Sequence, residues 1–220
     1  MKATTIALSA GFGVAVTGAL TLFLASRATP HSIQRSIYYD SGPKHPVTDE
    51  MTRKLQEMSR REAPHFELRD VDGRPVVLGR TRSDRPQFLY FVMDGCPCSE
   101  DVEPLLQKLY HHFGERVDFV AVTDAKPEQA AKWSRQMLMP YPLVSDPKLE
   151  VVKAYQAVNS VYSALVNRDG QVVKMWPGYS QGILKEMNDA MAEILGEKPR
   201  AFDASYAPVE KTSGCSFAVR

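Results

Sequence analysis

The sequence has no surplus of charge of either sign, because 27 lysines and arginines nearly balance 26 aspartates and glutamates. Proteins that bind nucleic acids carry a clear basic surplus, so we expect no nucleic-acid partner. Cysteine is also scarce, and three residues are too few for a disulfide scaffold or a tetrahedral zinc set. With 44% hydrophobic and 24% charged residues over 220 positions, the chain is otherwise typical of one mid-sized globular domain.

Charge is absent from one long stretch near the N-terminus. Ile6 to Ala25 are twenty residues without a charged side chain, and a helix of that length spans about 30 Å, the thickness of the hydrocarbon core. The stretch exceeds the roughly 7–15 apolar residues of a signal peptide, and no clear cleavage site follows it. We predict an uncleaved single-pass anchor with the domain on the extracytoplasmic, periplasmic side, and keep secretion after signal cleavage as the alternative. The flanking basic residues do not decide the orientation.

The distribution of polar, apolar and turn-forming residues divides the chain into segments. The predicted segments are a membrane anchor or signal (1–26), a linker with a short charged helix (27–62), one folded domain (63–198) and an irregular tail (199–220). The short helix is expected from Thr48 to Glu62, with Thr48 or Asp49 as its N-cap. The tail contains the third cysteine, Cys215.

Strand and helix patterns alternate within the folded domain. Continuous apolar runs predict buried strands, and apolar residues at steps of three and four predict helices. The expected strands are 66–68, 75–78, 87–93, 117–122, 143–145, 161–167 and 171–175, and the expected helices are 97–113, 127–138, 147–156 and 181–195. Asp146 is expected to cap the third of these helices. This order predicts an α/β fold with a central mixed sheet, helices on both faces and an N-terminal β-hairpin.

Two cysteines, Cys96 and Cys98, lie where a buried strand ends and an amphipathic helix begins. Reactive groups of α/β sheets gather at the carboxyl ends of strands. Pro97 disfavours helical conformation in the residue before it and suits the first helical position, so Cys96 is predicted to be the N-cap. We expect its sulfur to face solvent and the N–H groups of Cys98 and Ser99, which would favour the nucleophilic thiolate. Acidic neighbours oppose this effect (Asp94, Glu100, Asp101 and Glu103), but as solvated groups they leave a net lowering of the Cys96 pKa.

Cys98 is the expected resolving thiol for Cys96. Residues two apart at a helix cap can approach the Cα separation of about 4.4–6.8 Å that disulfides use, although with strain. A strained disulfide is easily reduced, as suits a catalytic pair. Cys215 is the alternative resolving thiol if the tail folds back. A pair of small buried hydrophobic residues is the competing interpretation, and it fits the strand–helix junction poorly.

Several motifs occur in a fixed order along the domain. They are Ala63 to Gly73, which looks like an "APxFxLxDxxG" hairpin, Phe88 to Phe91 followed by Cys96-Pro97, Pro104 eight residues after Cys96, Val161 to Gly170, and Gly178. Over about 63–197 the chain resembles the thioredoxin-like superfamily, and within it the redoxin branch of the alkyl hydroperoxide reductase and thiol-specific antioxidant type (AhpC/TSA). That branch includes membrane-tethered thiol–disulfide oxidoreductases. The resemblance implies a three-layer thioredoxin-like fold, catalysis by Cys96 and Cys98, no cofactor, and partner proteins that supply thiols or disulfides.

The sequence departs from the family pattern at three places. The redox pair is Cys96-Pro97-Cys98, where the family usually has two residues between the cysteines. Val161 stands where the family has a cis-proline, and we expect a trans bond there because a cis bond before valine costs about 2.5–4 kcal/mol. Leu89 and Met93 replace the proline and the threonine or serine of family peroxidases.

These departures favour disulfide exchange over peroxide reduction as the function. The alternatives are a thiol peroxidase, in which Cys96 becomes a sulfenic acid, and a non-enzymatic copper-binding module using two thiolates. An inactive family member is the remaining alternative. His111 and His112 lie about 15 residues into the predicted helix, roughly 20 Å from Cys96, so we assign them to its C-terminal end rather than to a metal site.

Overall fold

The computed structural model describes residues 45–79 and 85–217. The predicted membrane segment, 6–25, lies outside the described residues, and so do residues 27–44 of the predicted linker segment. Within 45–79 and 85–217, no helix has the length and apolar character needed to cross a bilayer.

The described elements follow the predicted order closely. In chain order they are β1 (His45–Pro46), α3 (Asp49–Gln56), β2 (Phe66–Arg69), β3 (Pro75–Leu78), β4 (Gln87–Val92), α4 (Pro97–Phe113), β5 (Asp118–Thr123), α5 (Pro127–Gln136), β6 (Leu143–Ser145), α6 (Glu150–Ala154), β7 (Tyr162–Val166), β8 (Val172–Trp176), α7 (Gln181–Ile194) and β9 (Thr212–Ser213).

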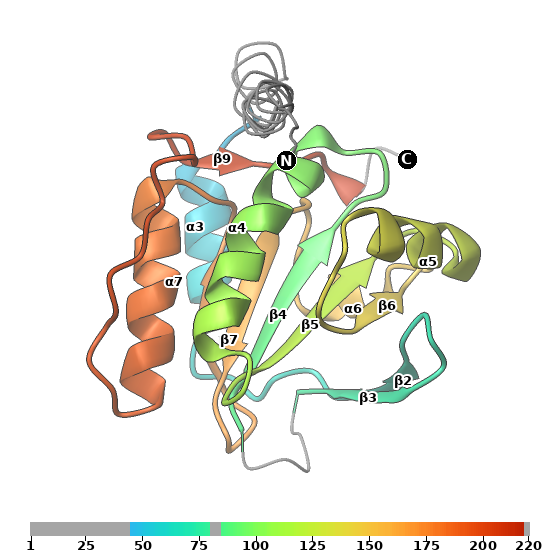
Figure 1. Cartoon of the computed structure of the whole chain (residues 1–220), viewed down its shortest axis with the longest axis horizontal. Helices are drawn as coiled ribbons and strands as arrows, with labels where there is room; N and C mark the ends of the chain where they lie inside the picture. The colour runs from blue at the N-terminus through green and yellow to red at the C-terminus, as the bar shows by residue number, and fades with distance from the viewer. Residues whose placement is uncertain (1–44, 80–84, 218–220) are drawn as a thin grey trace, which may run out of the picture. The chain divides into compact units, whose positions relative to one another are not determined.

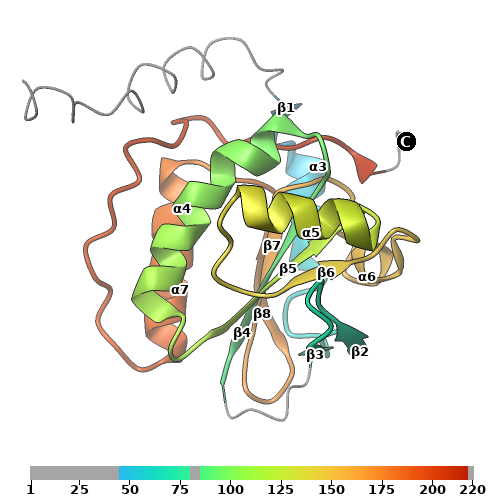
Figure 2. The same cartoon turned by 45° about the vertical axis from the view of Figure 1, so that its right-hand side comes forward.

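A five-stranded mixed sheet in the order β6-β5-β4-β7-β8 forms the centre of the domain. Its middle strand, β4, runs parallel to β5 and antiparallel to β7, so that Leu89 faces Val120 on one side and Ala164 on the other. Every residue of β4 is buried, which explains its continuous apolar run. Helices α4, α5 and α7 cover one face and α3 and α6 the other (Figures 1 and 2). The predicted mixed sheet between two helical layers is confirmed.

Helix α4 buries the face that its apolar spacing predicts. Val102, Leu105, Leu106, Leu109 and Phe113 are each at most 2% exposed. The helix crosses the sheet with the proline at position 104 inside it. This packing fixes the start of α4, and with it the cysteine pair, at the carboxyl end of β4.

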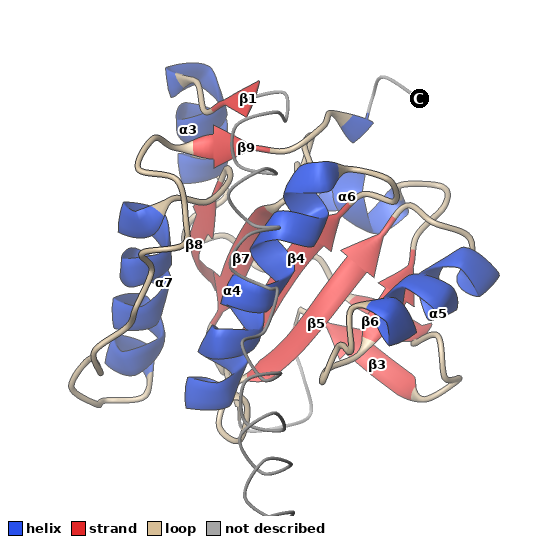
Figure 3. Ribbon diagram, turned by 45° about the horizontal axis from the view of Figure 1, so that its top comes forward, coloured by secondary structure: helices blue, strands red, loops and turns tan. Residues whose placement is uncertain are grey.

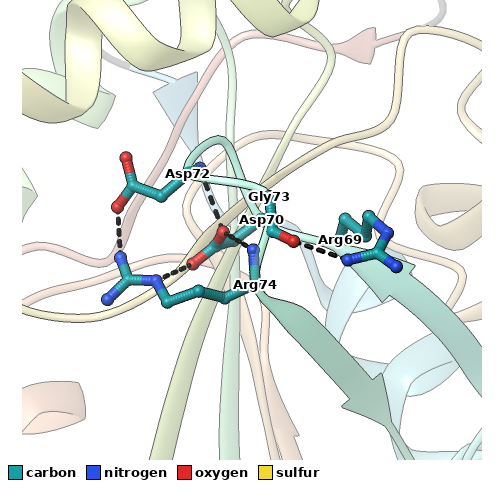
Figure 4. Close-up of polar contacts among 5 residues, drawn as sticks. All are labelled: Arg69, Asp70, Asp72, Gly73 and Arg74. Atoms are coloured by element: carbon teal, nitrogen blue, oxygen red, sulfur yellow. Dashed lines mark hydrogen bonds and ion pairs between the residues drawn. The ribbon is translucent and has the colours of Figure 1, made fainter.

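The predicted hairpin is present as β2 and β3, joined by a polar turn (Figure 4). The Asp70 carboxylate accepts hydrogen bonds from the backbone N–H groups of Asp72 and Arg74, at 3.0 and 2.8 Å. The Arg74 guanidinium pairs with both Asp70 and Asp72, and Arg69 donates to the Gly73 carbonyl at 2.7 Å. These contacts satisfy the backbone groups of the turn between the two strands of the predicted hairpin.

Two predicted helices are much shorter than expected. The first, α3, begins after its predicted N-cap, Thr48, whose hydroxyl accepts from the Met51 N–H at 3.2 Å, but it ends at Gln56. In α6 the N-cap is Leu149 in a left-handed conformation and not Asp146. The Asp146 carboxylate nevertheless accepts hydrogen bonds from the first three N–H groups of α6, at 2.8, 2.9 and 3.0 Å. The prediction that Asp146 satisfies the start of this helix is therefore confirmed, although Asp146 lies before the N-cap residue, Leu149.

The tail is not irregular throughout, which corrects the prediction. Strand β9 pairs antiparallel with β1, which comes from the predicted linker, and lies beside it in Figure 3. Single bridges join Tyr179 to Thr212 and Asn159 to Ser216. The tail passes α7 and reaches the end of the sheet where α4 begins (Figure 1). Strands of two residues have no detectable periodicity, so the sequence pattern could not predict them.

Candidate active site

Cys96 is the N-cap of α4, as predicted. Its backbone is extended, with φ −93° and ψ 116°, and Pro97 opens the helix. The Cys96 N–H donates to the Met93 carbonyl at 3.2 Å, and its own carbonyl accepts from the Ser99 N–H at 2.9 Å. The proline therefore sets the conformation that places the sulfur at the junction between β4 and α4.

The groups that donate to the Cys96 sulfur differ from those predicted. No N–H of the first helical turn bonds the side chain of this N-cap residue. The Ser160 hydroxyl donates to Cys96 Sγ at 3.2 Å, and the backbone N–H of Cys215 donates to it at 3.3 Å. Both donors lie far from Cys96 in the sequence. They stabilise its thiolate, a role that we predicted for the N–H groups of Cys98 and Ser99.

The Cys96 side chain is also buried, whereas we expected it to face solvent. Its exposed fraction is 1%, and that of Cys98 is 6%. The tail lies across the site: the Ser160 N–H donates to the Cys215 carbonyl at 2.8 Å, and the Gly214 N–H donates to the Ser160 carbonyl at 3.1 Å. The expectation failed because it treated the tail as unstructured. The sulfur is nevertheless surrounded by polar donors rather than by aliphatic groups alone.

This environment separates the pKa values of the two cysteines. The hydrogen bond from the Cys98 thiol is the main cause that lowers the pKa of Cys96, and the Ser160 and Cys215 donors lower it further against the opposing effect of burial. The same hydrogen bond, together with burial, raises the pKa of Cys98. Cys96 is therefore the thiolate of the pair and Cys98 the thiol. No disulfide joins Cys96, Cys98 or Cys215 in this structure.

Val161 follows Ser160 in an unusual backbone conformation. No peptide bond among the described residues is cis, so the expected trans bond before Val161 is confirmed. Its φ is 58°, in the left-handed region that a β-branched residue rarely adopts. The Val161 N–H donates to the Phe91 carbonyl at 2.6 Å, which ties this turn to β4 beside the active site.

A buried carboxyl group on α4 was missed by the sequence analysis. Glu103, expected to be solvated, has no exposed surface. It accepts a hydrogen bond from Tyr141 at 2.7 Å, one from Gln107 at 3.0 Å, and one from the Tyr90 hydroxyl. Burial raises the pKa of Glu103, although these three donors oppose the rise. Its position among the apolar residues of α4, next to Val102, was the available signal for burial.

The histidines singled out in the sequence lie apart from the cysteines. His111 and His112 occupy the last turn of α4, as predicted. Over 45–79 and 85–217, no group of three or more histidine, cysteine or acidic side chains is arranged to hold a metal ion.

The AhpC/TSA family model matches residues 60–190. The chain belongs to the AhpC/TSA family. Among curated proteins, the thiol-disulfide oxidoreductase ResA of Halalkalibacterium halodurans is 30% identical over 142 residues, which are 64% of this chain and 77% of that protein. The methylamine utilization protein MauD of Methylophilus methylotrophus is 29% identical over 117 residues, so the chain matches about half of it, 52%.

Solved structures of family-like proteins share the fold. A thiol:disulfide interchange protein DsbE from Chlorobium tepidum has a TM-score of 0.57 at 23% identity, with 63% of this chain and 98% of that chain covered. The peroxidoxin BcpB from Mycobacterium tuberculosis has a TM-score of 0.52 at 22% identity, with 63% and 97% covered. The domain thus has the thioredoxin-like fold, which the disulfide-exchanging and the peroxide-related branches have in common.

Proposed function

We propose that this protein is a thiol–disulfide oxidoreductase in which Cys96 attacks a partner disulfide and Cys98 resolves the intermediate. The observation that carries the proposal is the polarised pair: Cys96 accepts hydrogen bonds from Ser160 and from the Cys215 N–H, at 3.2 and 3.3 Å, and its pKa is lowered. The thiolate is the attacking species in disulfide exchange. The relatives named thiol-disulfide oxidoreductases support the same reaction class.

The reaction runs in two exchange steps. The Cys96 thiolate attacks one sulfur of the partner disulfide, forms a mixed disulfide, and releases the other partner sulfur as a thiolate that takes up a proton. Cys98 then loses its proton and attacks Cys96 Sγ, which releases the second partner thiol. The partner gains two electrons, and the two cysteines lose two as they form their own disulfide. No cofactor takes part, and thiols of another partner protein return Cys96 and Cys98 to the reduced state.

Residues at two further positions favour disulfide exchange over peroxide reduction. Leu89 and Met93 occupy the positions where family peroxidases carry a proline and a hydroxyl residue, and both are buried, at 0% and 3% exposure. Neither side chain can donate a hydrogen bond to a bound peroxide.

The sequence further supports a location for this chemistry. We propose that residues 6–25 anchor the chain in a membrane with the redox domain, 63–198, on the extracytoplasmic side. Partner disulfides are common in that oxidising compartment, which suits the proposed activity.

Insulin reduction tests the assignment. The reduced full-length protein should reduce insulin disulfides, and Cys96→Ser should lose the activity. A variant that keeps Cys96 as its only cysteine, Cys98→Ser with Cys215→Ser, should accumulate a mixed disulfide on Cys96 detectable by mass spectrometry. Thermal melting of each variant controls for folding. Equal rates for the wild type and a folded Cys96→Ser variant would remove Cys96 from the mechanism.

A further inference from the structure

Within the proposed function, on which this inference rests, we propose that Cys215 is a third redox thiol, which takes over the disulfide from the Cys96–Cys98 pair and carries it to the tail. The proposal rests on the position of the tail over the active-site sulfur and on a histidine beside the Cys215 thiol.

Cys215 lies close to Cys96. The Cys215 backbone nitrogen lies 3.3 Å from Cys96 Sγ. Adding an N–Cα bond of about 1.5 Å places the Cys215 Cα within about 4.8 Å of that sulfur. Bridged cysteines have Cα atoms about 4.4–6.8 Å apart, and because the Cys215 backbone already contacts the Cys96 sulfur, only a small movement separates the two residues from a disulfide. The Cys215 side chain also contributes a hydrogen bond that lowers the pKa of Cys96, as a neighbouring thiol would.

A histidine lies beside the Cys215 thiol. The distance from Cys215 Sγ to His45 Nε2 is 3.8 Å. His45 is in β1 and is paired with Ser213 of β9, two residues before Cys215, so the strand pair holds the histidine close to the start of the segment that carries the thiol. An imidazole nitrogen is a general base that can take the proton of a thiol in contact with it. His45 is therefore placed as the base that activates Cys215.

The backbone around Cys215 is fixed by several contacts. The Ser160 N–H donates to the Cys215 carbonyl at 2.8 Å, and the Asn159 side chain donates to the Gly214 carbonyl at 3.0 Å. A Cβ at Gly214 would lie 2.0 Å from Ser160 Oγ, so only glycine permits this approach. The tail is thus built to hold Cys215 against the site.

The proposed step is an intramolecular exchange. In the oxidised protein, His45 takes the proton of Cys215, and the resulting thiolate attacks Cys96 Sγ of the Cys96–Cys98 disulfide. The Cys96–Cys215 bond forms, the Cys96–Cys98 bond breaks, and Cys98 leaves as a thiolate that takes the proton from His45. No electrons are gained or lost overall. Cys215 is partly exposed whereas Cys96 and Cys98 are buried, so the step moves one sulfur of the disulfide to a more exposed position.

The test uses the reduced full-length protein and 5,5′-dithiobis(2-nitrobenzoate) as a model disulfide. In Cys98→Ser, the nitrobenzoate adduct on Cys96 should be resolved by Cys215, which gives two released thiolates per protein and a Cys96–Cys215 linked peptide in mass spectrometry. In Cys98→Ser with Cys215→Ser, one thiolate should be released and the adduct should remain on Cys96. The oxidised wild type should contain both Cys96–Cys98 and Cys96–Cys215 linked peptides.

A second pair of variants tests the histidine. Adding His45→Gln to Cys98→Ser should slow the second release at pH 7 by about tenfold or more, since it removes a general base. His65→Gln is the matched control, because His65 directly precedes β2, outside the β1–β9 pair that holds His45, and its ring lies 3.9 Å from the Glu67 carboxylate. It should leave the rate unchanged.

The two possible failures differ in outcome. A stable adduct on Cys96 in Cys98→Ser, with Cys215 still reduced and the thermal melt unchanged, would overturn the role of Cys215 alone. If no adduct forms on Cys96 even in the double variant, the proposed function itself fails.

Discussion

Removal of the Ser160 hydroxyl should raise the pKa of Cys96. The hydroxyl donates to Cys96 Sγ at 3.2 Å, and both residues are buried, at 0% and 1% exposure. A hydrogen bond to a charged group contributes about 1.5–3 kcal/mol, and one pKa unit corresponds to 1.36 kcal/mol. If the neutral thiol gains little from the same hydroxyl, Ser160→Ala should raise the pKa of Cys96 by about 1 to 2 units.

The measurement follows the thiolate of Cys96 directly. The rate of iodoacetamide modification of the Cys96 peptide is recorded by mass spectrometry from pH 3 to pH 10, in the wild type and in Ser160→Ala. The titration midpoint should move to higher pH in the variant, because a weaker donor set leaves the charged form less favoured. The remaining donors, the Cys98 thiol and the Cys215 N–H, should keep the midpoint below that of an ordinary cysteine.

Ser163→Ala is the matched control for this variant. Ser163 is also buried, at 1% exposure, and its hydroxyl has no hydrogen-bond partner among the described residues. Ser163→Ala deletes the same hydroxyl oxygen without removing a hydrogen bond to sulfur, so the titration midpoint of Cys96 should stay at its wild-type value. An unchanged midpoint in Ser160→Ala, or an equal shift in both variants, would refute the assignment of Ser160 as a donor to the thiolate.

Three further outcomes follow from the structure. Val161→Pro should lower the free energy of unfolding by at least about 2 kcal/mol in urea titrations, because proline holds φ near −65° and cannot donate to the Phe91 carbonyl, whereas Val161→Ala keeps that bond and should lose less. Since burial raises the pKa of Glu103 in the folded state, the wild type should lose stability relative to Glu103→Gln as pH rises above about 4.3, the unfolded value, and a constant difference would contradict this. Since the pKa of Cys96 is lowered in the folded state, the stability of the reduced protein relative to Cys96→Ser should be greatest above about pH 8.5 and decline as pH falls, by up to about 1.4 kcal/mol per pH unit.

Local rules predicted the position of the redox pair but not its surroundings. Pro97 sets the conformation of Cys96 through steric contacts between neighbouring residues, so the N-cap could be predicted from the sequence alone. The donors to its sulfur, Ser160 and Cys215, are 64 and 119 residues away in the chain, and only the assembled fold brings them together. The mixed sheet was predictable because each strand carries a strong apolar run.

The burial of Glu103 shows a different limit of sequence reasoning. Charged residues are almost never fully buried unless they are paired, so a solvated position was the reasonable expectation for this carboxyl group. Its partners, Tyr90 and Tyr141, lie 13 and 38 residues away and supply the hydrogen bonds that make burial possible. The position of Glu103 on its helix indicated burial, whereas its charged side chain suggested exposure to solvent.

The close approach of Gly214 to Ser160 has an evolutionary consequence. A side chain at position 214 would meet the Ser160 hydroxyl and backbone, so a mutation there would lift the final segment away from the thiolate. We therefore expect homologues either to keep Ser160, Gly214 and Cys215 together or to lose all three. In a homologue that lacks the final segment, the cysteine equivalent to Cys96 would be uncovered. Its thiolate would also lose the hydrogen bond that the Cys215 N–H donates here.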